Sequence, residues 1–354
     1  MTDYENWRAT VTLGEPAWMP YNIGLTRSSW ANFGAEQEKV VLSHPETWPH
    51  YQEGQYERML EGPWSIKEDP TRDFVDQWGC VWRTTQYGFV GTIVEHPLSS
   101  EEALRTFTPP PAETYNGGQT PADFERAAAH LARMKRDGGR PMGGLDHGYF
   151  LLRLEYLRGF ENLMCDLIEP SDDFMRLYNT VHALNRAAVQ HWIDAGAELI
   201  SLPEDLGGQD RSLIGPTYFR RWALPCYKEL HEMVHQAGGL TYFHCDGNIM
   251  DISDQILEIE PDVFNPQDRA NGIDALAETF KGRMCLALDF DRQHALPFGS
   301  PQDIADLLEY EVRTLGSANG GLMVQVEIRG DVPPDNLDAV AASLERLKTF
   351  WFED

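Results

Sequence analysis

The sequence lacks the features of membrane and secreted proteins. No run of about 18 apolar residues occurs in the 354-residue chain, so we expect no transmembrane helix. The first residues, MTDYENWRAT, are acidic and polar, which predicts that no secretory signal is present. The five cysteines are odd in number and form no CxxC pair, so a disulfide framework is not expected and a reduced, cytoplasmic compartment is favoured.

Positive charge is also scarce. The chain has 29 Lys and Arg against 56 Asp and Glu, a formal net charge of −27. The electrostatic field of this negative charge repels phosphate groups, so neither nucleic acid nor an anionic membrane is expected as a partner. Hydrophobic residues make up 42% of the chain, which is typical of globular proteins and excludes bulk disorder.

Several catalytic and nucleotide-binding signatures are missing. Neither GxGxxG nor GxxxxGK[ST] follows an apolar run, which removes the usual reason to expect a doubly wound nucleotide-binding sheet. The absence of GxSxG disfavours a serine hydrolase, and no HExxH occurs. No low-complexity linker interrupts the chain, so we predict a single domain over residues 1–354.

Beyond the irregular first 120 residues, short apolar runs alternate with helical patterns, as in βα units. The fold class predicted is α/β: a (β/α)8 TIM barrel with an elaborated N-terminal segment, with a doubly wound sheet as the competitor. The expected strands are Trp18–Ile23, Phe89–Val94, Pro141–Leu145, Glu198–Leu202, Leu240–His244, Asp262–Asn265, Met284–Phe290 and Gly321–Glu327.

Helices are expected between these strands. Ser171 and Ser300 are N-cap residues ahead of apolar stripes at helical spacing, and Gly316 marks the end of the second helix. Three further helical patterns cover residues 122–136, 218–236 and 337–351.

Functional residues of a barrel gather at the C-terminal ends of its strands. One such end reads His244-Cys245-Asp246, where alternation puts His244 and Asp246 on one face and Cys245 on the other. A histidine with a carboxylate suits zinc or a harder divalent metal. The alternative is a hydrogen-bonded turn without a metal.

A second strand end carries Glu204 and Asp205, followed by Gly-Gly-Gln209. The two carboxylates suit a metal ligand and a general base. The alternative is that Asp205 and Gln209 cap the following turn.

Three more strand ends carry polar residues. Glu327 could complete the metal site or form a surface pair with Arg329. Asp289 and Asp291 share one face of their segment. His147 stands alone after its strand, and a lone histidine is more often structural than catalytic.

Stretches spread along the chain in a fixed order resemble the uroporphyrinogen decarboxylase superfamily. They are Asp76–Trp82, Glu95–Leu98, Glu204–Gln209, Gly215–Phe219, His244–Gly247, Asp291–Gly299 and Asp331–Asn336. The resemblance implies a (β/α)8 barrel with its site at the strand C-termini. The superfamily includes the decarboxylase and zinc methyltransferases that act with corrinoid proteins and thiols such as coenzyme M. It also implies a homodimer.

The methyltransferase branch binds zinc through a His-x-Cys pair and a later cysteine. In this chain His244 keeps the first position, Asp246 replaces the first cysteine, and the later cysteine falls near Glu327. The resemblance therefore implies His244, Asp246 and Glu327 as ligands of Zn2+ or another divalent metal. Without thiolates the metal is more Lewis-acidic, which suits polarising a substrate oxygen.

The decarboxylase branch grips the porphyrin carboxylates with an arginine-rich segment near its N-terminus. The corresponding segment here, Met19–Arg27, offers only Arg27, so an authentic uroporphyrinogen decarboxylase is disfavoured. We expect Asn22 and Arg27 to contact a different substrate.

The leading hypothesis is a metal-dependent methyltransferase or demethylase acting on a small oxygenated organic substrate, with a corrinoid protein as candidate partner. Glu204, Asp205 and Asp291 are the predicted catalytic residues. The predicted substrate-binding residues are Asn22, Arg27, Tyr149, Gln209 and Gln293.

Two other functions stay open. One is a decarboxylase or other carbon–carbon lyase, whose carboxylated substrate would need cations such as Arg27, Arg153, Arg158 and Arg329. The other is a barrel that binds a small molecule or a corrinoid protein without turnover.

Overall fold

The structure, a computed structural model, describes residues 1–352. The chain folds into two compact units, and each unit combines segments that are distant in sequence. Unit 1 holds residues 1–68, 86–88 and the chain from 265 onward, whereas unit 2 holds 69–85 and 89–264. That the whole chain is one domain stays a prediction. None of the described helices is long and apolar enough to cross a membrane.

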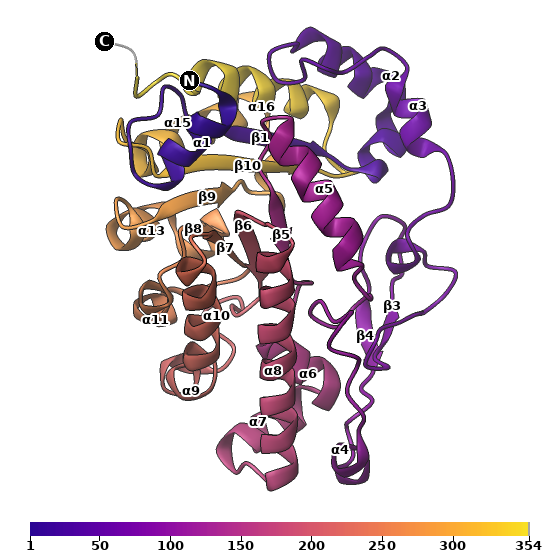
Figure 1. Cartoon of the computed structure of the whole chain (residues 1–354). Helices are drawn as coiled ribbons and strands as arrows, with labels where there is room; N and C mark the ends of the chain where they lie inside the picture. Colours follow the sequence, from indigo (N-terminus) through magenta and orange to yellow (C-terminus); the bar gives the residue numbers. More distant parts are fainter. Residues whose placement is uncertain (353–354) are drawn as a thin grey trace. The chain divides into compact units, whose positions relative to one another are not determined.

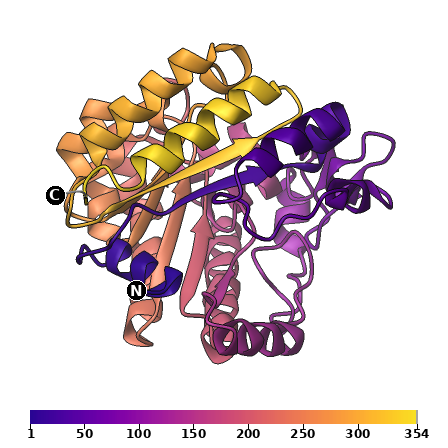
Figure 2. The same cartoon turned by 90° about the horizontal axis from the view of Figure 1, so that it is seen from above.

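Unit 1 contains parallel strands in the order β1-β10-β9, with Tyr21 opposite Val324 and Leu322 opposite Leu286. The first strand of the chain thus pairs with the last, which is typical of barrel-type winding. Helices α15 and α16 lie side by side (Figure 2). The elements are α1 (Asp3–Val11), β1 (Tyr21–Leu25), α2 (Arg27–Ser43), α3 (Gln55–Leu60), η1 (Ile66–Glu68), α12 (Asp268–Asn271), α13 (Ile273–Phe280), β9 (Cys285–Asp289), α14 (Ala295–Phe298), α15 (Pro301–Leu315), β10 (Leu322–Ile328) and α16 (Pro334–Leu347).

Unit 2 contains parallel strands in the order β7-β6-β5, and helices connect each strand to the next. Helices α8 and α10 pack against each other (Figure 1). The elements are β2 (Phe74–Val75), β3 (Val81–Arg83), β4 (Thr92–Glu95), α4 (Glu101–Thr106), α5 (Phe124–Arg136), β5 (Met142–Gly144), α6 (Leu151–Arg158), α7 (Phe160–Ile168), α8 (Asp172–Asp194), β6 (Leu199–Pro203), α9 (Gly215–Trp222), α10 (Leu224–Gln236), β7 (Leu240–Cys245), η2 (Met250–Ile252) and α11 (Ser253–Ile259). Strand β8 (Val263–Pro266) spans the boundary between the units.

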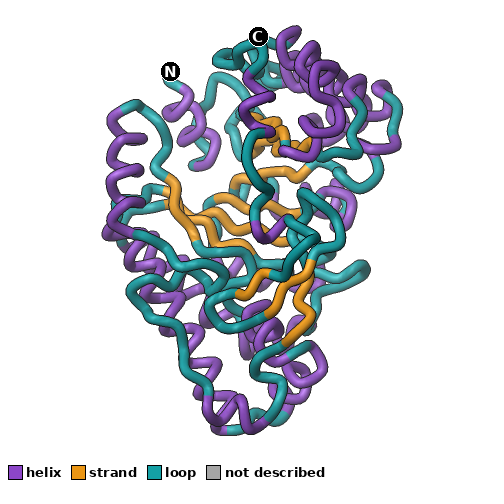
Figure 3. The backbone as a smooth tube through the Cα atoms, turned by 90° about the vertical axis from the view of Figure 1, so that its right-hand side faces the viewer, coloured by secondary structure: helices purple, strands orange, loops and turns teal. Residues whose placement is uncertain are grey.

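The predicted α/β class with parallel strands is confirmed, but the closed eight-stranded barrel is not. The expected strand Phe89–Val94 is β4, which joins β2 and β3 in a small antiparallel sheet, drawn with the other strands in orange in Figure 3. The link from β3 to β4 is too short for the crossover of a dozen or more residues that parallel pairing needs. The described strands outside this small sheet therefore number seven.

The helix predictions are confirmed with one change. Ser171 caps α8 by accepting from the Phe174 backbone N–H at 3.1 Å, and Ser300 forms a capping box with Asp303 at the start of α15. The single helix expected over 218–236 is instead two helices, α9 and α10. Pro225 explains the break, because it has no N–H to donate and its ring clashes with the preceding turn.

Candidate metal centre

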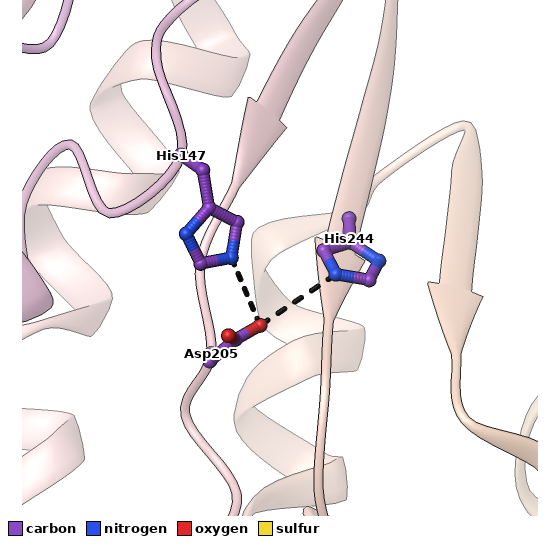
Figure 4. Close-up of side chains that lie close together, drawn as sticks. All are labelled: His147, Asp205 and His244. Atoms are coloured by element: carbon purple, nitrogen blue, oxygen red, sulfur yellow. Dashed lines mark ion pairs between the residues drawn. The ribbon is translucent and has the colours of Figure 1, made fainter. Parts of the chain in front are cut away.

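Two imidazoles and one carboxylate converge at the strand ends of unit 2 (Figure 4). His147 follows β5, Asp205 follows β6 and His244 lies near the end of β7. The Asp205 Oδ1 atom lies 3.0 Å from His147 Nε2 and 3.5 Å from His244 Nε2. The three ligand atoms lie within 4.8 Å of one another, and residues 1–352 contain no other such His, Cys, Asp or Glu group.

Backbone contacts between the β6 and β7 loops fix this geometry. Pro203 is opposite His244 in the sheet register. Beyond the strands, Gly207 and Gly247 pack backbone to backbone, and a Cβ on either glycine would overlap the other. The Asp246 N–H donates to Asp205 Oδ1 at 3.1 Å. The glycines noted in the sequence are thus required for the close approach of the two loops.

Electrostatics keep Asp205 ionised. Burial by itself would raise the pKa of Asp205, but hydrogen bonds to His147 and His244 more than offset it and hold this pKa well below its usual range. About a third of the Asp205 and His147 side chains is exposed, so the cluster is open to solvent and to small ligands. The centre therefore presents an anionic oxygen and two nitrogens.

Cys245 is excluded from the cluster by strand alternation. Its side chain is fully buried on the opposite face of β7, as the sequence predicts. Its sulfur accepts from the Leu206 N–H at 3.2 Å, and burial raises the pKa of the thiol well above its ordinary value. A buried neutral thiol of this kind is a core residue.

Asp246 lies at the edge of the cluster. Its Oδ1 atom is 3.5 Å from His244 Nε2, so His244 lies between two carboxylates. The predicted pairing of His244 with Asp246 at a metal stays a prediction, and the geometry makes Asp246 a candidate fourth ligand.

Glu204 points away from the cluster although it is next to Asp205 in sequence. It is fully buried, and its two oxygens accept the backbone N–H groups of Phe150, at 2.5 Å, and Leu152, at 3.2 Å. Burial raises the pKa of Glu204 to about 7, and those two hydrogen bonds limit the rise. Its predicted catalytic role stays a prediction.

Two other predicted residues of unit 2, Tyr149 and Gln209, differ in their exposure to solvent. Tyr149 is fully buried, with its ring edge-on to Tyr227 at 5.7 Å between centroids. Gln209 is exposed in the loop after β6. Their substrate contacts stay predictions.

In unit 1, Asp291 is held by many donors. Its oxygens accept the backbone N–H groups of residues 293, 294 and 295 and a guanidinium N–H of Arg269 at 2.7 Å. Burial by itself would raise the pKa of Asp291, but these donors lower it. The carboxylate thus stabilises the turn before α14, and its predicted catalytic role stays a prediction.

The remaining predicted residues also lie in unit 1. Glu327 forms an ion pair with Arg329, the surface pair that the sequence offered as an alternative. Arg27 donates to the backbone carbonyls of residues 60, 62 and 63, and stacks over Trp64 at 4.6 Å. Asn22 and Gln293 are exposed. Their roles at a metal or substrate stay predictions.

His147 is the member of the cluster that the sequence analysis took for a structural residue. Its position directly after a strand, like those of Asp205 and His244, brought it forward, but it has no metal-ligating neighbour in the sequence that would distinguish it from a structural histidine.

Three solved structures are similar to this chain, and the first of them supports the fold. A methyltransferase from Methanosarcina mazei is 14% identical, with a TM-score of 0.62 over 96% of this chain and 97% of that one. A 3-keto-D-glucoside 4-epimerase from E. coli is 13% identical, with a TM-score of 0.38 over 64% of this chain and 88% of that one. A D-psicose 3-epimerase is 8% identical, with a TM-score of 0.40 over 65% and 85%. No curated protein matches the sequence.

The sequence itself also matches a family model. The model described as uroporphyrinogen decarboxylase (URO-D) covers residues 90–347, which is more than half of the chain and includes all three residues of the cluster. The chain therefore belongs to the uroporphyrinogen decarboxylase family.

Proposed function

We propose that this protein is a metal-dependent methyltransferase or demethylase acting on a small oxygenated organic substrate, with a corrinoid protein as its partner and a homodimer as its assembly. The observation that carries the proposal is the convergence of His147, Asp205 and His244 at the strand ends. The similarity of the fold to a methyltransferase supports the reaction type.

The donor set fits a divalent metal. Two imidazole nitrogens and one carboxylate oxygen suit Zn2+, and the same set suits other first-row metals such as Fe2+. The low pKa of Asp205 keeps its carboxylate in the form that binds metal. Partial exposure of His147 and Asp205 leaves room for a substrate atom, as catalytic metal sites require.

Each part of the site has a proposed role. His147, Asp205 and His244 would hold the ion, with Asp246 as a candidate fourth ligand. The bound metal would supply Lewis-acid polarisation of a substrate oxygen, which makes an attached methyl group a better target for a nucleophile. The rigid contact of the β6 and β7 loops would keep this arrangement fixed while substrate binds.

A carbon–carbon lyase is the second candidate, because the matching family model describes a decarboxylase. Its carboxylated substrate would need cationic groups. The structure shows Arg153 bound to Asp76 at 2.6 Å and Arg158 bound to Asp166 at 2.6 Å, with both arginines buried. Burial and these ion pairs keep both guanidinium groups from a substrate carboxylate, so we favour methyl transfer.

The first experiment is metal analysis of the purified protein and of His244→Ala. We expect about one divalent ion per wild-type chain and a large loss in the variant. His182→Ala is the matched control, because His182 pairs with Glu229 outside the cluster. Equal metal content in the wild type and His244→Ala would contradict the assignment.

The second experiment identifies the reaction. The metal-loaded protein is incubated with methyl ethers and with reduced cobalamin as methyl acceptor, and methylcobalamin is followed by its absorbance. Release of carbon dioxide from candidate acids, without any methyl acceptor, would instead support the lyase.

A further inference from the structure

Glu204 forms a buried link between the helix α6 and the strand end that carries Asp205. Its carboxylate accepts the N–H groups of Phe150, the residue before α6, and of Leu152 in the first turn of that helix. A negative group at a helix N-terminus is stabilised by the helix dipole and by the unsatisfied N–H groups there. These bonds fix the segment that begins just after His147.

Backbone hydrogen bonds beside the Glu204 side chain connect its strand end to the segments that carry His147 and His244. The Glu204 N–H donates to the His244 carbonyl at 3.0 Å. The carbonyl of the preceding residue, Pro203, accepts the Gly148 N–H at 3.0 Å. Because successive side chains of an extended segment point to opposite sides, a Glu204 turned to the helix leaves Asp205 turned to the imidazoles.

We propose that Glu204 is a positioning residue, whose carboxylate sets the spacing of His147, Asp205 and His244 for metal binding by holding the α6 N-terminus. The inference rests on the proposed metal site. It differs from the role of ligand or general base that the sequence suggested, since Glu204 acts here only through its neighbours.

The two backbone donors favour a side chain with two acceptor oxygens at this position. Two oxygens accept two N–H groups, one each from Phe150 and Leu152. A glutamine has one acceptor oxygen, so its amide N–H2 would face the second backbone N–H. Two N–H donors would then face each other in a buried place with no acceptor between them. Their repulsion should push the segment carrying His147 away from the strand end.

The test compares Glu204→Gln with Asp262→Asn. Asp262 is a matched control, because its carboxylate accepts the Thr241 N–H at 2.7 Å near the other end of β7. Zn2+ affinity is measured by competition with a chelator. We expect Glu204→Gln to bind Zn2+ about 10- to 100-fold more weakly and to change the absorption of the Co2+-loaded protein. Asp262→Asn should change neither.

A second measurement does not depend on metal. In the metal-free protein, the 15N signals of the His147 and His244 imidazoles should move in Glu204→Gln and stay in place in Asp262→Asn. If the wild type binds no Zn2+, the proposed function fails, and the imidazole signals alone decide the role of Glu204.

One result would overturn the inference: a folded Glu204→Gln protein with wild-type Zn2+ affinity and unmoved imidazole signals. Where Glu204→Gln does not fold, Glu204→Asp replaces it. That variant keeps the charge but withdraws the carboxylate by one methylene, and the same expectations and the same contrary result apply to it.

Discussion

Histidine and carboxylate groups meet in both units, but in opposite proportions. In unit 1, His44 lies between two carboxylates, with Nδ1 2.9 Å from Glu345 and Nε2 3.1 Å from Asp338. In unit 2, Asp205 lies between two imidazoles. The first arrangement uses both nitrogens of one ring in salt bridges, whereas the second gathers two rings around one oxygen.

The proportions give the two groups different chemistry. Burial by itself would lower the pKa of His44, but hydrogen bonds to Glu345 and Asp338 in α16 raise it, so these contacts favour the charged form of the imidazole. In unit 2 two imidazoles converge on one Asp205 oxygen, with Asp246 at the edge of the group, and this is the donor set proposed to hold a metal ion. The number of imidazoles at one carboxylate thus distinguishes the His44 salt bridges from the proposed metal centre.

Of the substitutions in the two groups, Asp205→Asn should have the largest effect, which is on Zn2+ affinity. The variant keeps the volume but removes the only charge that the two imidazoles of the cluster share, so Zn2+ affinity should fall by more than about 100-fold. Calorimetric titration with Zn2+ measures the change. Asp338→Asn is the matched control in unit 1, and an equal loss of affinity in that variant would break the comparison.

His231 supplies a third case, an imidazole without a hydrogen-bonded carboxylate. Both of its nitrogens lack a hydrogen-bond partner among the described residues, and its ring packs edge-on against Phe243. Burial lowers the pKa of His231 to about 3 from the ordinary value of 6.5. The neutral ring is favoured in the folded state, so its contribution is complete above pH 6.5 and is lost as the pH falls toward 3.

The loss should reach on the order of 4 kcal/mol of unfolding free energy at the acid end. His231→Leu should therefore move the midpoint of acid unfolding to lower pH. The free energy of unfolding in urea, measured for both proteins between pH 4 and pH 7, tests this. An equal fall of that free energy with decreasing pH in both proteins would show that His231 does not control acid stability.

His44 should show the opposite pH dependence with a smaller effect. Because its folded-state pKa is raised, its stabilisation is complete below the unfolded value of about 6.5 and is lost as the pH rises through the folded-state pKa. His44→Gln should lower the free energy of unfolding by about 1 kcal/mol at pH 5.5 and by less at pH 9. An effect that grows with pH would contradict the raised pKa of His44.

Asp338→Asn should have the smallest effect on stability. More than half of the Asp338 side chain is exposed, so water and salt weaken its pairing with His44. We expect a loss of about 0.5 kcal/mol or less at low salt and none at 1 M NaCl. A larger loss that resists salt would show that Asp338, rather than Glu345, holds the charge of His44.

Much of the fold could be predicted because the signals are local. The apolar runs gave the strands of both units, and Ser171 and Ser300 marked true helix starts. The errors concern features that depend on contacts with other segments of the chain. Phe89–Val94 has strand character in any sheet, and only pairing with Val81–Arg83 makes it antiparallel.

The candidate site could be predicted in part. Strand alternation correctly separated His244 from the buried Cys245. The sequence also brought Asp205 forward as a strand-end carboxylate, and the structure places it beside His244. The sequence favoured a structural role for His147, because a lone histidine in a loop has no local feature that distinguishes a ligand from a structural residue.

The sequence by itself determined the class of fold and the strand ends where polar groups stand, because periodicity, caps and glycines act over a few residues. The family follows from a match that extends over residues 90–347. Only the tertiary structure decided which of those groups meet. Adjacent carboxylates took opposite directions, Glu204 toward the α6 N-terminus and Asp205 toward two imidazoles. That choice depends on hydrogen bonds between segments that are distant along the chain, and no local pattern contains them.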